Sequence, residues 1–542
     1  MQGENWKSET SANIGKLQRH FQALELGVAY FSNDWKRRAK KIATFAPRPL
    51  SAYADTMRRI FFIALASLAI SSRASVDVRL DGELLWMSAD KATLREVMQA
   101  FAHAGVSVRY DDGISATCSG VLTNADAGKS LADLFGPFGY VITWDVVRGP
   151  IGDITRLAEI QVFRTGNKDA AKPLVDNNKL PVTRLPGHPP FVSDEILVGF
   201  KPGTKMDQVR AMLAKVGGTI VSSIPKLGIY RIRLPPGANV LSLVDMLKTD
   251  GVVADVEPNY VTQLPRGTGI ADANSPALRN LGSPAKGAAT VAILDSGQLS
   301  GNGYDAGVVG KYNAIQPGAP MTDAVGHGTQ MSMLVAGSVS PTGATGDGTG
   351  EVPVLAVRAF DDSGLTSNYA LMDAINYAGD QGAKVVNLSW GSDTSSDFVS
   401  AAISKAQTDG MIVVAAAGNE PTGNPVYPSA YPGVVSVAAL NADGTPWQSS
   451  NYGSTVTVAA PGFANFPVGH DGPPGDYAGT SIASAYVSRA LAEYMTQNPS
   501  ATAAQTVSAL KTSVTPVGTG SNPHYGFGAL DTAAMQRLLG NK

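Results

Sequence analysis

The sequence contains only one cysteine, Cys118, among its 542 residues. An internal disulfide is therefore excluded, and cysteine usage says nothing about the redox compartment. Charged residues are also few, at 16%, and neither sign is in excess, because 43 lysines and arginines stand against 45 aspartates and glutamates. A chain without a basic surplus lacks the electrostatic footprint of a nucleic-acid-binding protein. We therefore expect no nucleic-acid partner.

Hydrophobic residues, in contrast, make up 44% of the chain. That share is ample for burying a sizeable core, and it excludes general disorder. Because domains usually contain about 100 to 200 residues, the length predicts three or so globular units.

A short apolar stretch, Ile60 to Ile70, follows the basic start Met57-Arg58-Arg59 and precedes small residues up to Ala74. The stretch is too short to span a bilayer, which takes about 20 residues. This order predicts a signal peptide over residues 57–74 and hence export, with a buried core helix as the alternative. Residues 1–56 form an uncertain extension, and we interpret Met57 as the true translation start.

The next segment, residues 76–164, shows two rounds of strand-like alternation and helical periodicity. The predicted elements are strand 76–80, helix 94–101, strand 106–110, helix 131–135, and strands 140–144 and 159–163. The run "ATLREVMQAFAHAGVSVRYDD" resembles the short N-terminal domain of secretins and TonB-dependent receptors. The resemblance implies an interaction module with an envelope protein as partner, in the periplasm, at the outer membrane or secreted from a Gram-negative bacterium. An α/β domain without a partner role is the alternative.

Residues 165–192 are rich in proline and lack apolar periodicity, which predicts an extended linker. Residues 193–262 then repeat the order strand-helix-strand: 195–200, 206–216 and 219–222, followed by 227–234, 240–247 and 252–257. With its closing "VEPNYV", this segment resembles the inhibitory propeptide of subtilases. The resemblance implies that the tail from about Tyr260 enters an active-site cleft and that residues 263–288 are an activation linker. An independent binding domain is the alternative.

From Ala289 to the C-terminus, continuous apolar runs alternate with helical stretches. The runs are 291–294, 354–357 and 412–416, and the helical stretches include 368–381 and 396–410. Continuous runs of β-branched and small residues are typical of buried parallel strands, so we expect an α/β sheet with helices on both faces. Functional groups in such folds collect at the carboxyl ends of the strands.

Three short motifs carry residues suited to nucleophilic catalysis. Asp295 follows the first apolar run in "AILDSG", His327 lies in "GHGTQ", and Ser481 lies in "GTSIAS". Each motif alone has a plain structural reading, as a turn, a structural histidine or a helix start. Together, in the order Asp, His, Ser, they resemble the subtilase family and differ from the orders of α/β-hydrolases and chymotrypsin-like enzymes.

The resemblance implies a subtilisin-like, mostly parallel sheet with helices on both faces, preceded by two small α/β (α+β) domains. It implies a serine endopeptidase that hydrolyses protein or peptide substrates through an acyl-enzyme, with Asp295, His327 and Ser481 as the triad. Asn419, in "AAAGNE", corresponds to the oxyanion-hole donor. The chain is then a self-processing zymogen inhibited by its own propeptide. The alternative is an envelope interaction protein whose protease domain stays permanently self-inhibited.

Substrate-binding residues follow from the same resemblance. Ser389, Trp390 and Gly391 correspond to an edge segment that pairs with extended peptides, with Trp390 as an apolar wall or, alternatively, as core packing. Ala417 and Gly418 correspond to another side of the primary pocket. Val426 corresponds to its floor, and a floor filled by valine predicts that large aromatic residues are disfavoured there.

Two features depart from the family pattern. Arg489 stands in the helix after Ser481, where it predicts either a packed charge pair or a docking surface. The stretch 338–350 lacks the usual appearance of a calcium loop. We expect a flexible surface loop there, although a structural calcium at Asp347 stays open. No cofactor is required for the implied chemistry, and no other metal site is expected.

Overall fold

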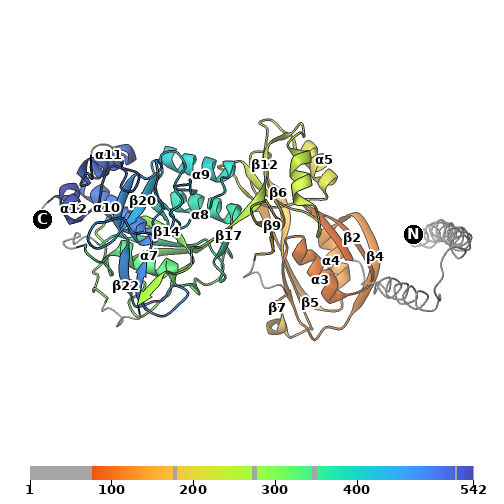
Figure 1. Cartoon of the computed structure of the whole chain (residues 1–542). Coiled ribbons are helices and arrows are strands. Elements are labelled where there is room, and N and C mark those ends of the chain that lie inside the picture. Colours follow the sequence, from red (N-terminus) through yellow and green to blue (C-terminus); the bar gives the residue numbers. More distant parts are fainter. Residues whose placement is uncertain (1–75, 175–179, 272–277, 345–350, 519–521, 541–542) are drawn as a thin grey trace, which may run out of the picture. The chain divides into compact units, whose positions relative to one another are not determined.

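The computed structural model describes residues 76–174, 180–271, 278–344, 351–518 and 522–540. The extension, the predicted signal peptide and Asp347 lie outside these residues. No helix within the described part is long and apolar enough to cross a membrane. We refer below to the N-terminal domain (76–163), the middle domain (191–263) and the C-terminal domain (289–540), which are shown in Figure 1.

The N-terminal domain contains two sheets and two helices. Its elements are β1 (Val76–Asp81), β2 (Leu84–Thr93), α3 (Leu94–His103), β3 (Ser107–Tyr110), β4 (Thr117–Asp126), α4 (Ala127–Phe135), β5 (Gly139–Val147) and β6 (Ile154–Phe163). One sheet has the order β1-β2-β4 and the other β5-β6-β3-β7. Phe101 of α3 and Leu131 and Phe135 of α4 are fully buried in a common core. The predicted elements are confirmed, but β2 and β4 were missed, because the half-exposed β4 has little apolar alternation.

The predicted linker is not uniformly free of structure. Short strands β7 (Lys172–Pro173) and β8 (Val182–Thr183) pair with β3 and β9. The sequence did not predict these two-residue strands, which are too short to leave a periodic pattern.

The middle domain consists of β9 (Phe191–Phe200), α5 (Met206–Val216), β10 (Thr219–Ile224), β11 (Ile229–Arg233), α6 (Val240–Leu247) and β12 (Val253–Gln263). The antiparallel order β10-β11-β9-β12 gives a sheet with two buried faces. Alternation in β9 directs Leu197 to one face and Ile196 and Val198 to the other. The first face packs against the C-terminal domain, and the second carries α5 and α6.

The C-terminal domain is built on a seven-stranded parallel sheet in the order β15-β16-β14-β18-β19-β20-β21. The strands are β14 (Val291–Asp295), β15 (Val308–Asn313), β16 (Val354–Arg358), β18 (Val385–Leu388), β19 (Ile412–Ala416), β20 (Val435–Leu440) and β21 (Val458–Pro461). Helices α7 (His327–Ala336) and α10 (Thr480–Gln497) cover one face, and α8 (Asn368–Asp380) and α9 (Asp397–Thr408) the other. This is the α/β arrangement that the apolar runs predicted.

Smaller elements complete this domain. They are β17 (Leu365–Ser367), the hairpin β22 (Phe463–Phe466) and β23 (Gly475–Ala478), α11 (Ala503–Ser513) and α12 (Thr532–Leu539). Strand β13 (Gly269–Ala271), which precedes the domain in sequence, pairs with β23.

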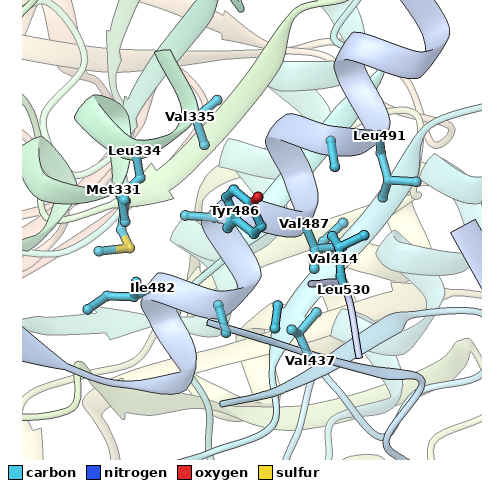
Figure 2. Close-up of a cluster of buried hydrophobic side chains, with 14 of the residues drawn as sticks. Met331, Leu334, Val335, Val414, Val437, Ile482, Tyr486, Val487, Leu491 and Leu530 are labelled. Atoms are coloured by element: carbon cyan, nitrogen blue, oxygen red, sulfur yellow. The ribbon is translucent and has the colours of Figure 1, made fainter. Parts of the chain in front are cut away.

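Helix α10 is buried along most of its length. Figure 2 shows Tyr486 of α10 facing Leu334 and Val335 of α7, within a cluster that also includes Val414 and Val437 of the sheet. Such a helix can approach its neighbours closely because small residues alternate with large ones along it.

Arg489 also lies in α10 and is completely buried. Its Nε donates to Glu493 Oε1 at 2.8 Å, one helical turn further on. A Cβ at Gly337 would lie 3.0 Å from the Arg489 guanidinium carbon, so the glycine leaves room for it. The predicted packed charge pair is confirmed. A docking surface at Arg489 is excluded because its side chain is buried.

The middle domain docks on the C-terminal domain through strand pairing and polar contacts. Strand β12 pairs antiparallel with β17, so that Gln263 lies opposite Leu365. The buried Asn259 accepts a hydrogen bond from the Tyr369 N–H at the start of α8 and donates to Glu195. These contacts determine where the chain leaves the middle domain.

Candidate active site

Asp295 and His327 are brought together by the ends of two elements. Asp295 is the last residue of β14, at the carboxyl edge of the parallel sheet, and His327 is the first residue of α7. Their side chains are 1% and 3% exposed, and His327 Nδ1 lies 2.7 Å from Asp295 Oδ1. Gly326 allows this approach: its φ is +88°, and a Cβ there would collide with the carbonyl of Gly469.

The environment of His327 favours the imidazolium. Burial alone would lower the pKa of His327, but the carboxylates of Asp295, Asp323 and Asp471 raise it above the ordinary value of 6.5. A base in this position can accept a proton at its outer nitrogen while Asp295 holds the inner one.

Ser481 is the second residue of α10, and its side chain is nearly buried. In this structure its hydroxyl donates to the carbonyl of Ser389 at 3.0 Å. Ser481 and His327 line the same cavity, together with Ile482, Met331 and Gln330. The structure therefore brings a hydroxyl and an imidazole from distant parts of the sequence to one site.

Asn419 lines this cavity as well. Its side-chain oxygen accepts hydrogen bonds from the main-chain N–H and the hydroxyl of Thr480, at 3.0 and 2.8 Å. With the oxygen engaged, the amide NH₂ remains as a donor beside Ser481. A fixed amide donor next to a nucleophile is the arrangement that stabilises a developing oxyanion.

A segment between the middle and C-terminal domains, residues 264–268, crosses the site. At one end, the Leu264 N–H donates to the carbonyl of Gly364 at 2.8 Å. At the other, the carbonyl of Thr268 accepts from the Ala478 N–H at 3.2 Å, and β13 continues this pairing with β23. Pro265, Arg266 and Thr268 line the same cavity as His327 and Ser481. This crossing segment covers the site and is held on both sides of it.

His470 was not singled out from the sequence. Its ring lies 4.4 Å from that of His327, tilted by 47°, and it lines the same cavity as Pro265. Burial, with His327 nearby, lowers the pKa of His470 to about 2, so it stays neutral. The glycine- and proline-rich loop around it gave no motif, and only packing places it beside His327.

Comparisons with known proteins match this arrangement. The model described as the fervidolysin N-terminal prodomain matches residues 178–259, and that of the subtilase family matches residues 286–528. Over 203 residues the chain is 34% identical to thermitase of Thermoactinomyces vulgaris, covering 37% of this chain and 72% of thermitase. The chain belongs to the subtilase family. It is a subtilisin-like serine peptidase with a prodomain, which is the middle domain.

Other subtilases show similar coverage. The alkaline protease of Alkalihalobacillus alcalophilus is 31% identical over 301 residues, which are 54% of this chain and 77% of that protein. Among solved structures, fervidolysin from Fervidobacterium pennivorans superposes with a TM-score of 0.51 at 21% identity. The match covers 67% of this chain and 62% of fervidolysin. Because the identity is only 21%, the match supports the fold alone.

The residues assigned to substrate binding in this subtilase lie around two backbone segments. Ser389 is buried, with its hydroxyl held by Asn387 and Ser484. A Cβ on Gly391 would lie 2.5 Å from one methyl of Val426, and one on Gly418 would lie 3.2 Å from the other. Val426 therefore fills the space between Gly391 and Gly418, next to the nearly buried Ala417.

Trp390 does not form the apolar wall that we predicted. Its side chain is 3% exposed, and its indole N–H donates to the carbonyl of Leu294 at 3.1 Å. The ring packs against Phe360 in the core on the α8–α9 side of the sheet. Trp390 is therefore a core residue beneath the edge segment. Core packing was the alternative that the sequence left open.

Proposed function

We propose that this subtilase is an exported endopeptidase, made as a self-processing zymogen, with Asp295, His327 and Ser481 as its catalytic triad. The observation that carries the proposal is the 2.7 Å contact between the buried Asp295 and His327, at a cavity that also contains Ser481. The order and chemistry of the three groups are those of a Ser-His-Asp acyl-transfer site.

The residues have distinct roles in this reaction. His327 removes the hydroxyl proton of Ser481 as Oγ bonds to the scissile carbonyl carbon, and then gives that proton to the leaving amine as the C–N bond breaks. Water, activated in the same way, hydrolyses the resulting ester. For the first step Ser481 must exchange its partner, the Ser389 carbonyl, for the ring of His327. Asn419 and the Ser481 N–H stabilise the oxyanion.

The crossing segment supports a latent form of the enzyme. Because residues 264–268 are paired on both sides of Ser481, an external peptide cannot take the same path until the segment is cut or displaced. The segment is itself an extended peptide next to the nucleophile, so it is the first substrate.

We expect self-cleavage within the crossing segment. Purified full-length chain should convert over time to two fragments, and mass spectrometry should place the new N-terminus between Arg266 and Gly269. The uncut chain should label slowly with a serine-directed phosphonate, and the cut chain rapidly. A chain that is neither cut nor labelled would contradict the proposal, whereas an uncut chain that labels only after mild unfolding would favour the permanently self-inhibited alternative.

Val426 should limit the residue accepted on the amino side of the scissile bond. Replacing Val426 with glycine opens the space between Gly391 and Gly418, and we expect kcat/KM for substrates with Phe or Tyr at that position to rise by at least about tenfold. A peptide-library profile of both proteins measures this. The matched control is Val309→Gly at an exposed strand position, 59% exposed. An unmodified enzyme that already prefers Phe or Tyr would overturn the assignment.

Export and the envelope partner stay proposals that rest on the sequence alone. The order of residues 57–74 supports a signal peptide, and the secretin-like pattern of the N-terminal domain supports an envelope protein as its partner. The chemistry of the triad requires no cofactor.

A further inference from the structure

The N-terminal domain contributes to the hydrophobic core of the middle domain. Val147, at the end of β5, and Ile154, at the start of β6, are 6% and 9% exposed. Both belong to the buried cluster formed by the middle domain's own sheet and helices, which includes Ile196 and Val198. The cluster that packs α3 and α4 of the N-terminal domain is a separate one. The tip of the β5–β6 hairpin therefore packs into its neighbour's core.

Tyr230 of β11 is the residue that receives this hairpin tip. Its side chain is fully buried, and its hydroxyl accepts a hydrogen bond from the Ile151 N–H at 3.2 Å. Gly149 lies against the Tyr230 ring so closely that a Cβ there would collide with it. Ser223 adds a hydrogen bond from its hydroxyl to the carbonyl of Arg148. The hydroxyls of Tyr230 and Ser223 are thus both hydrogen-bonded to the backbone of the β5–β6 hairpin tip.

A second line of contact runs along the edge of β1. The Thr219 hydroxyl at the start of β10 donates to the carbonyl of Leu80 at 2.9 Å. Gly105, with φ +91°, lies directly against Val221, and a Cβ there would collide with that side chain. The two domains therefore meet at two sites, one beside the turn of the β10–β11 hairpin and one toward the start of β10.

We propose that the N-terminal domain and the middle domain form one inhibitory unit, in which the β5–β6 hairpin tip stabilises the prodomain fold and so prolongs inhibition. The middle domain is small, and a domain of this size buries only part of its surface by itself. Anything that binds its folded form shifts the equilibrium toward the form that docks on α8 and α9. The inhibitory half of this proposal rests on the proposed function, whereas the association of the two domains does not.

The association can be tested without activity. A recognition sequence for a site-specific protease replaces residues 175–179 in the full chain carrying Ser481→Ala, and the cut protein is run on size-exclusion chromatography. The N-terminal fragment should co-elute with the remainder. Val147→Asp, which places a charge in the shared core, should weaken this association at least about tenfold. The control Val146→Asp, at the neighbouring position that is 48% exposed, should leave it unchanged.

The inhibitory half needs the active chain. Val147→Asp should shorten the lag between self-cleavage and full peptidase activity, roughly tenfold, and Val146→Asp should not. Separation of the unmodified fragments would overturn the proposal whether or not the variants fold. If the unmodified fragments co-elute but the Val147→Asp and Val146→Asp chains show equal lags, the inhibitory half of the proposal is overturned. If no variant shows any peptidase activity while the fragments still co-elute, the proposed function fails and the shared unit stands.

Discussion

Replacing Ser481 with alanine is expected to leave the chain uncut and to lower peptide hydrolysis by roughly 10⁶-fold, the magnitude found for subtilisin, a member of this family. The loss is large because alanine has no hydroxyl to form the acyl-enzyme, and the remaining members of the triad cannot replace it. Conversion of the full chain is followed by mass spectrometry, and hydrolysis by release of a chromogenic amine from a peptide amide.

The matched control for this change is Ser488→Ala. Ser488 lies in the same helix, is also buried, and donates its hydroxyl to Asn387 at 3.1 Å, away from the cavity. Its loss should cost about 1 kcal/mol of stability and leave processing in place. Self-cleavage of the Ser481→Ala chain would show that another group, or a contaminating protease, performs the cut.

Replacing Asp295 with asparagine is expected to lower kcat by roughly 10⁴-fold, because the amide holds His327 in the wrong tautomer. The change also removes a carboxylate that raises the pKa of His327. The base must be neutral to accept a proton, so activity rises as pH increases through this pKa. The acid limb of the remaining activity should therefore shift to lower pH, which a pH profile of kcat/KM measures.

Asp305→Asn serves as the control for the charge change. Asp305 pairs with Lys311 at 3.1 Å on the surface of the same domain, and its loss should alter kcat/KM by less than about twofold. An acid limb that stays in place in the Asp295→Asn enzyme would mean that Asp295 does not determine the titration of His327.

The elements of the middle domain, and three strands and two long helices of the C-terminal domain, could be predicted because their patterns are strong. Uninterrupted runs such as Val291–Leu294 are typical of buried parallel strands, and the two rounds of strand, helix and strand in the middle domain keep their periods throughout. The weaker cases were β2 and β4, and the two-residue strands of the linker. Strands β4 and β7 pair with β2 and β3, which lie well before them in the sequence, so pairing rather than local propensity stabilises them.

The catalytic candidates are the part of this protein that the sequence by itself determined. Asp295, His327 and Ser481 stand at a strand end and at two helix starts, and their motifs, with the "AAAGNE" of Asn419, carry the resemblance to the subtilase family. For Arg489 the sequence left a packed charge pair and a docking surface open, and its complete burial decided for the charge pair.

Only the tertiary structure decided what surrounds those groups. His470 lies against His327, Trp390 packs into the core, and the β5–β6 hairpin enters the middle domain. Each of these depends on contacts between residues far apart in sequence. Local pattern carries no record of such contacts, because burial and hydrogen bonding between distant segments arise only when the chain packs.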